Sequence, residues 1–333
     1  MRPPAWWDRD GALPRLLAPL GAAYAAATAM RLARGVPHRP GVPVICVGNL
    51  DAGGTGKTPT VMALCERLST RGVAIRVVSR GHGGSLKGPA RVGPRHSAGE
   101  VGDEPLLLSA FAPTWVARDR AAGARAAEAA GAEAILLDDG FQNPAVAKDL
   151  SLVVVDAARG WGNGRALPAG PLREGIAAGL SRADAVLSLG DAAAQDAFSA
   201  RWGDRLKGLP HLRGELRPLP TGMPWAGLRA FAFAGIGRPE KFFATLDRLG
   251  AEVVGRVALS DHQPIPRALF DRLLADARRL GAQAVTTEKD AVRLPPEGRA
   301  QVLTLPVRLH LDNWGPLDAL LERARQPQRS ARS

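Results

Sequence analysis

Short apolar runs alternate with longer segments of mixed polarity over the first two thirds of the chain. The apolar runs, which we interpret as buried strands, are residues 41–49, 73–79, 114–117, 134–137, 152–155 and 185–189. The segments that we interpret as helices are residues 58–72, 104–112 and 118–131. Strands that alternate with helices of about 10–15 residues predict a doubly wound α/β fold with a parallel sheet.

A second alternating set follows a passage rich in Pro and Gly at residues 208–227. Its predicted strands are 231–235, 252–259, 284–287 and 302–311, and its predicted helices are 240–249, 267–280 and 317–325. This set predicts a second, smaller α/β lobe. We therefore divide the chain into an N-terminal amphipathic or membrane-associated helix region (1–40), a main domain (41–209), a second domain (210–325) and a disordered tail (326–333).

The N-terminal region contains an uncharged run at residues 16–30, which Arg15 and Arg31 bracket and Trp6 and Trp7 precede. As a helix this run would be about 22 Å long, shorter than a hydrocarbon core of about 30 Å. Tryptophan and arginine anchors favour a helix that lies in the membrane interface. The alternative is an ordinary helix at the edge of the domain.

Composition and net charge limit the classes of molecule that this protein is expected to bind. Apolar residues make up 46% and charged residues 23% of the chain, as in ordinary globular proteins, and the net charge is +12. A basic excess favours partners that carry phosphate, such as a nucleotide, a nucleic acid or an anionic membrane, unless it serves solubility alone. The two cysteines, Cys46 and Cys65, have no zinc-ligand spacing and indicate a reducing compartment.

The stretch VGNLDAGGTGKTP at residues 47–59 lies between a predicted strand and a predicted helix, as a phosphate-binding loop does. Its loop amides would surround the β-phosphate, Lys57 would reach the β- and γ-oxygens, and Thr58 would ligate Mg²⁺. Asp51 stands where the usual pattern has glycine, and we expect its side chain to point outward, away from phosphate. The main domain is therefore predicted to be P-loop NTPase-like, and its ATP-binding residues are Asp51, Ala52, Gly53, Gly54, Thr55, Gly56, Lys57 and Thr58.

Acidic residues follow the predicted strand at 134–137. In ILLDDGFQ, Asp138 would hold Mg²⁺ through water with Asp139 beside it, although Asp-Asp-Gly is also suited to a turn. GDEP places Asp103 before a helix, where it could serve as an N-cap, and SDHQ places His262 after a strand of the second lobe. If Asp103 and His262 meet between the lobes, the carboxylate would polarise the imidazole as a general base. The sequence leaves both readings open.

The order of the motifs is more specific than any one of them. VGNLDAGGTGKTP, SRGHGG, VGDEP, LLDDGFQ, GNGRALPAGPLRE, FAGIGRPEKFF, SDH and TTEKDAVRL follow one another from the N-terminal helix to about Leu311. This succession resembles the tetraacyldisaccharide 4′-kinase family, the lipid A 4′-kinases of Gram-negative bacteria. The loop of that family also lacks the first glycine.

The resemblance implies transfer of the γ-phosphate of ATP to the 4′-hydroxyl of tetraacyldisaccharide 1-phosphate, which gives lipid IV-A. It implies ATP and Mg²⁺ as cofactors and the cytoplasmic face of the inner membrane, an anionic surface, as the location. We expect no nucleic-acid partner, because no nucleic-acid motif occurs, and no obligate protein partner is evident. The resemblance assigns Lys57, Asp103 and His262 to catalysis and Arg173 to the active-site loop. The implied metal ligands are Thr58, Asp138, Asp139 and Glu174.

Departures from the family pattern occur at His82, where tyrosine is usual, at Asn143, where histidine is usual, and at Gln263 and Pro264. They put any role of residue 143 in acceptor contacts in doubt. Two other classes remain as alternatives. A membrane-associated ATPase switch of the partitioning type would carry a signature lysine where this chain has Ala52. A nucleic-acid-binding protein is suggested by charge alone. Other small-molecule kinases are excluded only by the family motifs.

Overall fold

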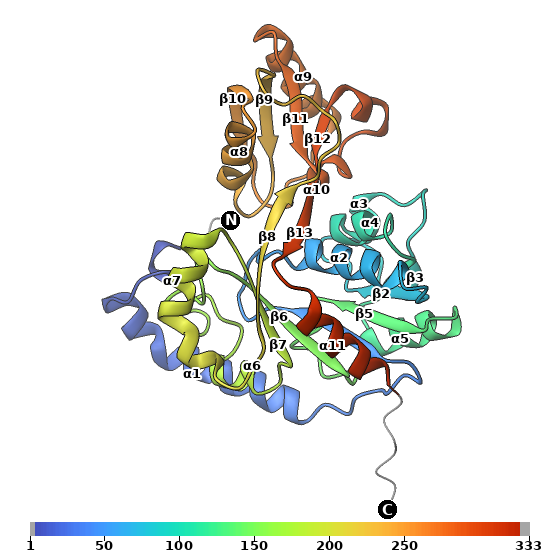
Figure 1. Ribbon diagram of the computed structural model, residues 1–333, viewed down its shortest axis with the longest axis vertical. Helices are drawn as coiled ribbons and strands as arrows, with labels where there is room; N and C mark the ends of the chain where they lie inside the picture. Colours follow the sequence, from blue (N-terminus) through green and yellow to red (C-terminus); the bar gives the residue numbers. More distant parts are fainter. Residues whose placement is uncertain (1–3, 327–333) are drawn as a thin grey trace, which may run out of the picture.

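The computed structural model describes residues 4–326, which form two α/β lobes (Figure 1). Within this range the larger lobe contains a nine-stranded sheet in the order β13-β8-β7-β6-β1-β5-β2-β4-β3. Its strands are β1 (Val44–Gly48), β2 (Ile75–Ser79), β3 (Ala90–Arg91), β4 (Thr114–Val116), β5 (Ala134–Asp138), β6 (Leu150–Asp156), β7 (Ala185–Leu189), β8 (His211–Pro218) and β13 (Val307–Leu311). Neighbours are parallel except at the two edges, where β13 and β3 run antiparallel. The predicted doubly wound parallel sheet is confirmed.

Helices cover both faces of this sheet. They are α2 (Lys57–Ser69), α3 (Ala98–Val101), α4 (Asp103–Leu108), α5 (Arg120–Ala129), α6 (Ile176–Leu180), α7 (Ala192–Trp202) and α11 (Gly315–Arg325), with the short turns η1 (Ala5–Trp7) and η2 (Gly203–Leu206). Alternate residues of β1 enter different cores: Ile45 packs in the core with α2 and α11, and Cys46 in the core with α5 and α7. A strand buried on both faces needs an unbroken apolar sequence, which is why β1 could be recognised.

The smaller lobe repeats this arrangement on a smaller scale. Its four-stranded parallel sheet has the order β10-β9-β11-β12, built from β9 (Arg229–Ala234), β10 (Glu252–Ala258), β11 (Gln283–Thr287) and β12 (Leu303–Leu305). The helices are α8 (Pro239–Arg248), α9 (Arg267–Arg279), α10 (Glu288–Ala291) and η3 (Pro296–Gln301). Phe243 of α8 packs on one side of the sheet and Phe270 of α9 on the other.

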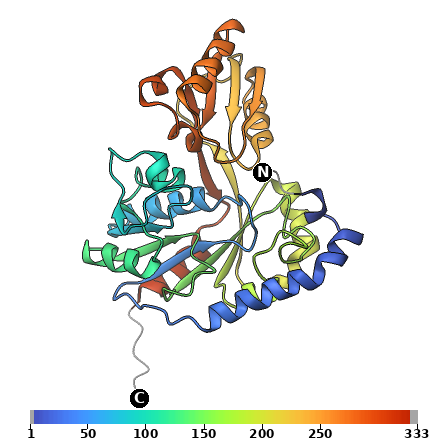
Figure 2. The same ribbon diagram turned by 180° about the vertical axis from the view of Figure 1, so that it is seen from behind.

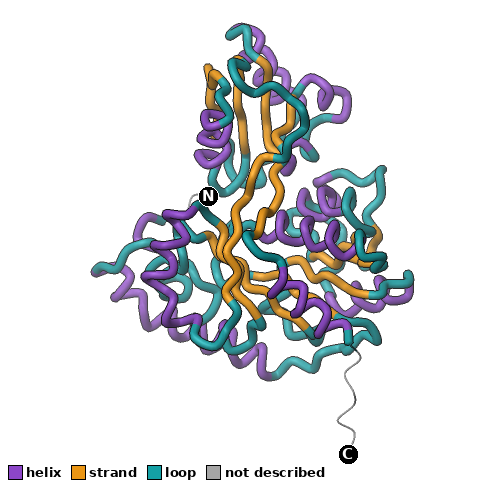
Figure 3. Tube along the Cα trace, viewed as in Figure 1, coloured by secondary structure: helices purple, strands orange, loops and turns teal. Residues whose placement is uncertain are grey.

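The chain passes between the lobes along two strands, β8 and β13, which pair with each other (Figure 3). The predicted second domain spans residues 210–325, whereas β8 and β13 belong to the nine-stranded sheet and α11 packs in its core. The run at 302–311, predicted as one strand, is two strands in different sheets. Pro306 separates them, because proline has no backbone N–H with which to continue a ladder.

The N-terminal helix α1 (Ala12–Ala33) lies along the base of the larger lobe (Figure 2). Its 22 residues make it about 33 Å long, so the length expected from the uncharged run was too short. The bracketing arginines fall inside the helix, and their exposed side chains let it continue beyond the apolar run. By length and composition alone α1 could cross a membrane. The predicted tail, apart from Gln326, lies outside the described residues.

Candidate functional site

The phosphate-binding loop joins β1 to α2 at the carboxyl edge of the sheet, where ligands of open α/β sheets bind. Gly56, the residue before α2, has φ 94°, and a Cβ there would lie 2.3 Å from Cδ1 of Leu189. Only glycine fits this backbone at that place. The Oγ1 atom of Thr55 is buried without a hydrogen-bond partner among the described residues. The loop therefore has the strand–loop–helix form that a nucleotide phosphate requires.

The segment of GNGRALPAGPLRE that contains Arg173 braces this loop. The backbone N–H of Ala52 donates to the carbonyl of Pro171 at 2.7 Å, and that of Arg173 donates to the carbonyl of Leu50 at 2.8 Å. Asp51 forms a single antiparallel bridge with Leu172 between these bonds. Residues more than a hundred positions apart in sequence thus form one wall of the site.

The expectation that Asp51 points outward is wrong. Its side chain is buried, and neither carboxylate oxygen has a hydrogen-bond partner in the described part of the chain. Burial raises the pKa of Asp51 to about 7, although nearby positive charges, Arg159 foremost, oppose this. The segment that contains Leu172 pairs with the loop at this residue. With a pKa of about 7, a large share of the Asp51 carboxyl groups is protonated near pH 7, which weakens their repulsion of a nearby phosphate.

Asp138 and Asp139 lie at the end of β5, beside the phosphate loop. The strand register pairs Val47 of β1 with Asp138. Oδ2 of Asp138 accepts a hydrogen bond from Oγ of Ser79 at 3.1 Å. Asp139 has φ 53° and lies 3.7 Å from Nζ of Lys57 and 3.1 Å from Nη1 of Arg173. The loop lysine, the acidic pair and the PLRE arginine therefore meet in one place.

The two carboxylates differ in electrostatics. Burial and the charge of Asp139 raise the pKa of Asp138 to about 6. Burial alone would raise the pKa of Asp139 too, but Lys57 and Arg173 outweigh it and hold that pKa below its ordinary value. Two adjacent carboxylates and the hydroxyl of Thr58 are hard oxygen donors of the kind that Mg²⁺ prefers. This donor set fits a magnesium ion next to the loop.

Glu174 is engaged elsewhere. Its buried carboxylate accepts hydrogen bonds from Nε2 of Gln142 at 2.9 Å and from Nη2 of Arg182 at 2.8 Å. Gln142 also donates to the carbonyl of Asn49 at 2.7 Å. The structure thus ties Glu174 to the strand that leads into the phosphate loop, and its assignment as a metal ligand stays a prediction.

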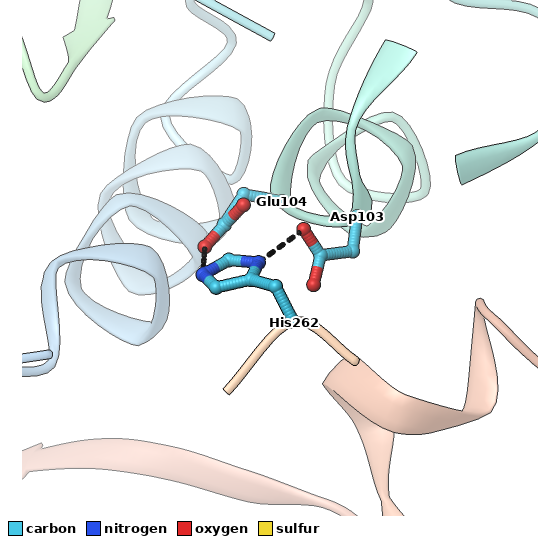
Figure 4. Close-up of side chains that lie close together, drawn as sticks. All are labelled: Asp103, Glu104 and His262. Atoms are coloured by element: carbon cyan, nitrogen blue, oxygen red, sulfur yellow. Dashed lines mark hydrogen bonds and ion pairs between the residues drawn. The ribbon is translucent and has the colours of Figure 1, made fainter. Parts of the chain in front are cut away.

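Asp103 and His262, which come from different lobes, meet (Figure 4). Nδ1 of His262 lies 2.9 Å from Oδ1 of Asp103, which is only 4% exposed. Burial would raise the pKa of Asp103, but His262 and neighbouring groups hold it well below its usual range. The same hydrogen bond raises the pKa of His262, against burial and the charge of Lys289. A carboxylate therefore orients and polarises an imidazole between the lobes.

Two charged neighbours of this pair were not anticipated. Nζ of Lys289 lies 2.8 Å from Oε1 of Glu104 and 3.1 Å from Nε2 of His262. Glu104 follows Asp103 directly, and Lys289 follows the end of β11 in TTEKDAVRL. Glu104 is part of VGDEP and Lys289 is part of TTEKDAVRL, but neither residue was predicted from the sequence to have a role of its own. The signal that could have found Lys289 is its place at the carboxyl end of a parallel strand, where ligand-binding residues gather.

The phosphate loop and the Asp103–His262 pair belong to one site. A Cβ on Gly237 of the smaller lobe would lie 4.0 Å from the amide nitrogen of Gly54 and 3.7 Å from Oδ2 of Asp261. Asp261 adjoins His262 in sequence. The smaller lobe thus covers the loop at the point where it brings its histidine to the larger lobe.

The departures from the family pattern occupy different places. The ring of His82 lies edge-on to that of His262, with centroids 5.7 Å apart. Gln263 accepts a hydrogen bond from the backbone of Ser260 within its own turn. Asn143 likewise accepts one from the backbone of Ala145. Of the three, only His82 contacts a proposed catalytic side chain.

Comparisons with known proteins agree with this geometry. A family model described as "LpxK: Tetraacyldisaccharide-1-P 4'-kinase" matches residues 13–326. A tetraacyldisaccharide 4′-kinase of Dinoroseobacter shibae is 66% identical, with 97% of both chains covered. One of Jannaschia sp. is 61% identical, covering 97% of this chain and 99% of that one.

The fold is also similar to that of a solved structure of a family member. It is a crystal structure of LpxK from Aquifex aeolicus, an "apo" form in complex with ATP, and it is 25% identical with a TM-score of 0.73. The match covers 94% of this chain and 99% of that chain. The matching family model and relatives show that the chain, with its phosphate loop, acidic pair and histidine–carboxylate pair, belongs to the tetraacyldisaccharide-1-P 4′-kinase family.

Proposed function

We propose that this chain transfers the γ-phosphate of ATP to the 4′-hydroxyl of tetraacyldisaccharide 1-phosphate, forming lipid IV-A, with the residues between its lobes as the catalytic machinery. Family membership and relatives of up to 66% identity support the activity. The observation that carries the site is the hydrogen bond between His262 and Asp103 above the phosphate loop.

The phosphate end of the site is formed by the larger lobe. The loop amides and Lys57 bind the phosphates of ATP and stabilise the charge that spreads over the transferring group. Asp139, which contacts both Lys57 and Arg173, keeps these cations in position. Thr58, Asp138 and Asp139 would hold Mg²⁺. Glu174, the residue after Arg173, is the fourth proposed ligand. When bound, the ion neutralises charge on the phosphate oxygens.

The acceptor end is formed where the lobes meet. Asp103 accepts the Nδ1–H of His262 and thereby leaves the lone pair of Nε2 available as a base. Nε2 removes the proton of the 4′-hydroxyl as that oxygen attacks the γ-phosphorus. The buried Asp103 fixes the ring orientation, so that the hydroxyl and the phosphate are held in line.

The helix α1 is the proposed contact with the anionic surface of the inner membrane, on its cytoplasmic face. Leu16 and Leu20 are 77% and 58% exposed, whereas Gly21 on the opposite side packs against Ala166, where a Cβ would lie 2.8 Å from the carbonyl oxygen. A helix packed along one side on its own domain is placed to lie on a membrane, with its exposed leucines inserted. This position brings a lipid substrate to the protein.

The activity is tested by transfer of labelled γ-phosphate from ATP to purified tetraacyldisaccharide 1-phosphate in mixed micelles. We expect transfer by the wild-type protein and its loss in Lys57→Ala. ATP hydrolysis that bare membranes stimulate, without transfer, would instead favour a partitioning-type switch. The absence of a signature lysine at Ala52 already argues against that switch.

A further inference from the structure

Lys289 holds together the charged groups around His262. It lies in α10 of the smaller lobe, with Nζ 2.8 Å from Glu104, 3.1 Å from Nε2 of His262 and 3.8 Å from Asp261. The side chain is only 22% exposed. A largely buried ammonium is costly unless it is paired, so this pairing constrains where Lys289 can be.

The contact with Nε2 also determines the tautomer of His262. An ammonium group has donors and no acceptor, so Nε2 must offer its lone pair to Lys289. The single ring proton then lies on Nδ1, 2.9 Å from the carboxylate of Asp103 that accepts it. Only the neutral ring with Nδ1–H satisfies both contacts.

The charges that face His262 oppose one another. Asp103 and Glu104 from α4, Asp261 from its own turn and Lys289 from α10 face the ring. The ring of His82 also packs on it, and Arg293, after α10, contacts Asp103. The hydrogen bond to Asp103 raises the pKa of His262, and Glu104 adds to this, whereas burial and Lys289 lower it. A general base must be unprotonated to work. The carboxylates that orient the ring therefore also lower the fraction of His262 that is unprotonated at a given pH, and Lys289 opposes this effect.

The ligand atoms around His262 are close enough together to hold a metal ion. Asp103, Glu104 and His262 each offer a ligand atom, and these atoms lie within 4.8 Å of one another. The ammonium of Lys289 already supplies a positive charge at this place, bound to two of the three residues. The cluster thus contains its own cation.

We propose that Lys289, anchored by Glu104, is a positioning residue that keeps Nε2 of His262 unprotonated and directed at the acceptor hydroxyl. This inference rests on the proposed role of His262 as the base. The arriving hydroxyl replaces the ammonium as the donor to Nε2, while Lys289 stays paired with Glu104. The hydroxyl oxygen then bonds to the γ-phosphorus, the bond from that phosphorus to the β–γ bridging oxygen breaks with its electrons on ADP, and the proton passes to Nε2.

The test is the pH dependence of kcat/KM for wild type, Lys289→Met and Lys289→Arg. We expect the acid limb of Lys289→Met to move to higher pH, with kcat/KM on the acid side falling about tenfold for each unit moved. Lys289→Arg keeps the charge and should keep the limb near its wild-type position. A loss in Lys289→Met that is equal at every pH, with the limb unmoved, would overturn the proposal. Lys289→Gln replaces the methionine variant if that one does not fold.

Nuclear magnetic resonance of histidine-labelled protein gives a second readout that needs no substrate. The His262 ring should titrate at higher pH in Lys289→Met than in wild type, and should report Nδ1–H as its neutral form. Identical titrations would refute the coupling. Full transfer by His262→Ala would refute the base role and this inference with it, whereas failure of the Lys289 test alone would leave the base role standing.

Discussion

The carboxylate of Asp156 accepts a hydrogen bond from Nζ of Lys241 at 2.7 Å, which joins the end of β6 in the larger lobe to α8 in the smaller one. Arg238, the residue before α8, donates to the same oxygen at 3.1 Å. The side chain of Asp156 is 11% exposed, whereas those of Arg238 and Lys241 are 36% and 52% exposed. Asp156 therefore binds the two lobes together beside the phosphate loop.

Asp156→Asn should weaken this contact and lower kcat/KM about tenfold, because a lost charged hydrogen bond costs about 1.4 kcal/mol or more. Small-angle scattering should show a larger radius of gyration. Glu252→Gln is the matched control, since it removes an exposed ion pair with Arg229 inside the smaller lobe and should change neither quantity. Indistinguishable behaviour of the two variants would contradict a role in joining the lobes.

His262→Ala and Asp103→Asn should each lower kcat by about 10²–10⁴-fold, the usual contribution of a general base. ATP affinity should change little, because neither residue contacts the phosphate loop. Because the two act as a unit, the double variant should lose little more than either single one. Rapid-quench kinetics with separate ATP binding measurements decide this. A loss of ATP affinity as large as the loss of kcat would indicate a structural role instead.

Asp51→Asn should stabilise the nucleotide-free protein at alkaline pH. Burial raises the pKa of Asp51 from 3.8 to about 7 in the folded protein, so folding favours the protonated form. The contribution of Asp51 to the stability is then greatest at low pH and declines as the pH rises between these two values, by an amount on the order of a few kcal/mol. An uncharged asparagine removes this decline. Urea unfolding at about pH 5 and pH 8 measures it, and a variant no more stable than wild type at the higher pH would contradict the burial argument.

Gly56→Ala should destabilise the protein by about 1–3 kcal/mol, because of its positive φ and the close approach of Leu189. Gly54→Ala in the same loop is the control, since a Cβ there meets nothing within 4 Å. Thermal unfolding without nucleotide compares the two. Equal melting temperatures would show that the loop backbone relaxes around the new methyl group.

The double variant Leu16→Glu/Leu20→Glu should reduce binding to vesicles that contain anionic lipid, because it places charges on the exposed apolar side of α1. Leu219→Glu introduces one charge at another exposed leucine outside α1 and should leave binding unchanged. Vesicle flotation provides the measurement. Equal binding by all three proteins would exclude this side of α1 as the membrane contact.

Local patterns were enough to predict most of the fold and to propose the phosphate-loop part of the candidate site. The phosphate loop and the acidic end of β5 lie next to strands buried on both faces, whose apolar runs stand out in the sequence. The lobe edges were less clear, because β8 contains polar positions and follows Gly208 and Pro210. Pro306, which separates β12 from β13, lies within a run that otherwise reads as one strand.

The remainder depends on contacts between distant residues. Asp103 and His262 lie 159 positions apart, and no periodicity links them. Lys289 and Glu104 likewise meet only when the lobes come together. The burial of Asp51 could not be foreseen from the loop alone either, since the segment that pairs with it at Leu172 is more than a hundred positions away.

The paired crossing of β8 and β13 determines how the lobes can move. The two strands are hydrogen-bonded along residues 214–218 and 307–311, so they behave as a single ribbon and not as two independent tethers. Any turn of the smaller lobe must therefore move both strands together, which restricts the positions that His262 can take relative to Asp103.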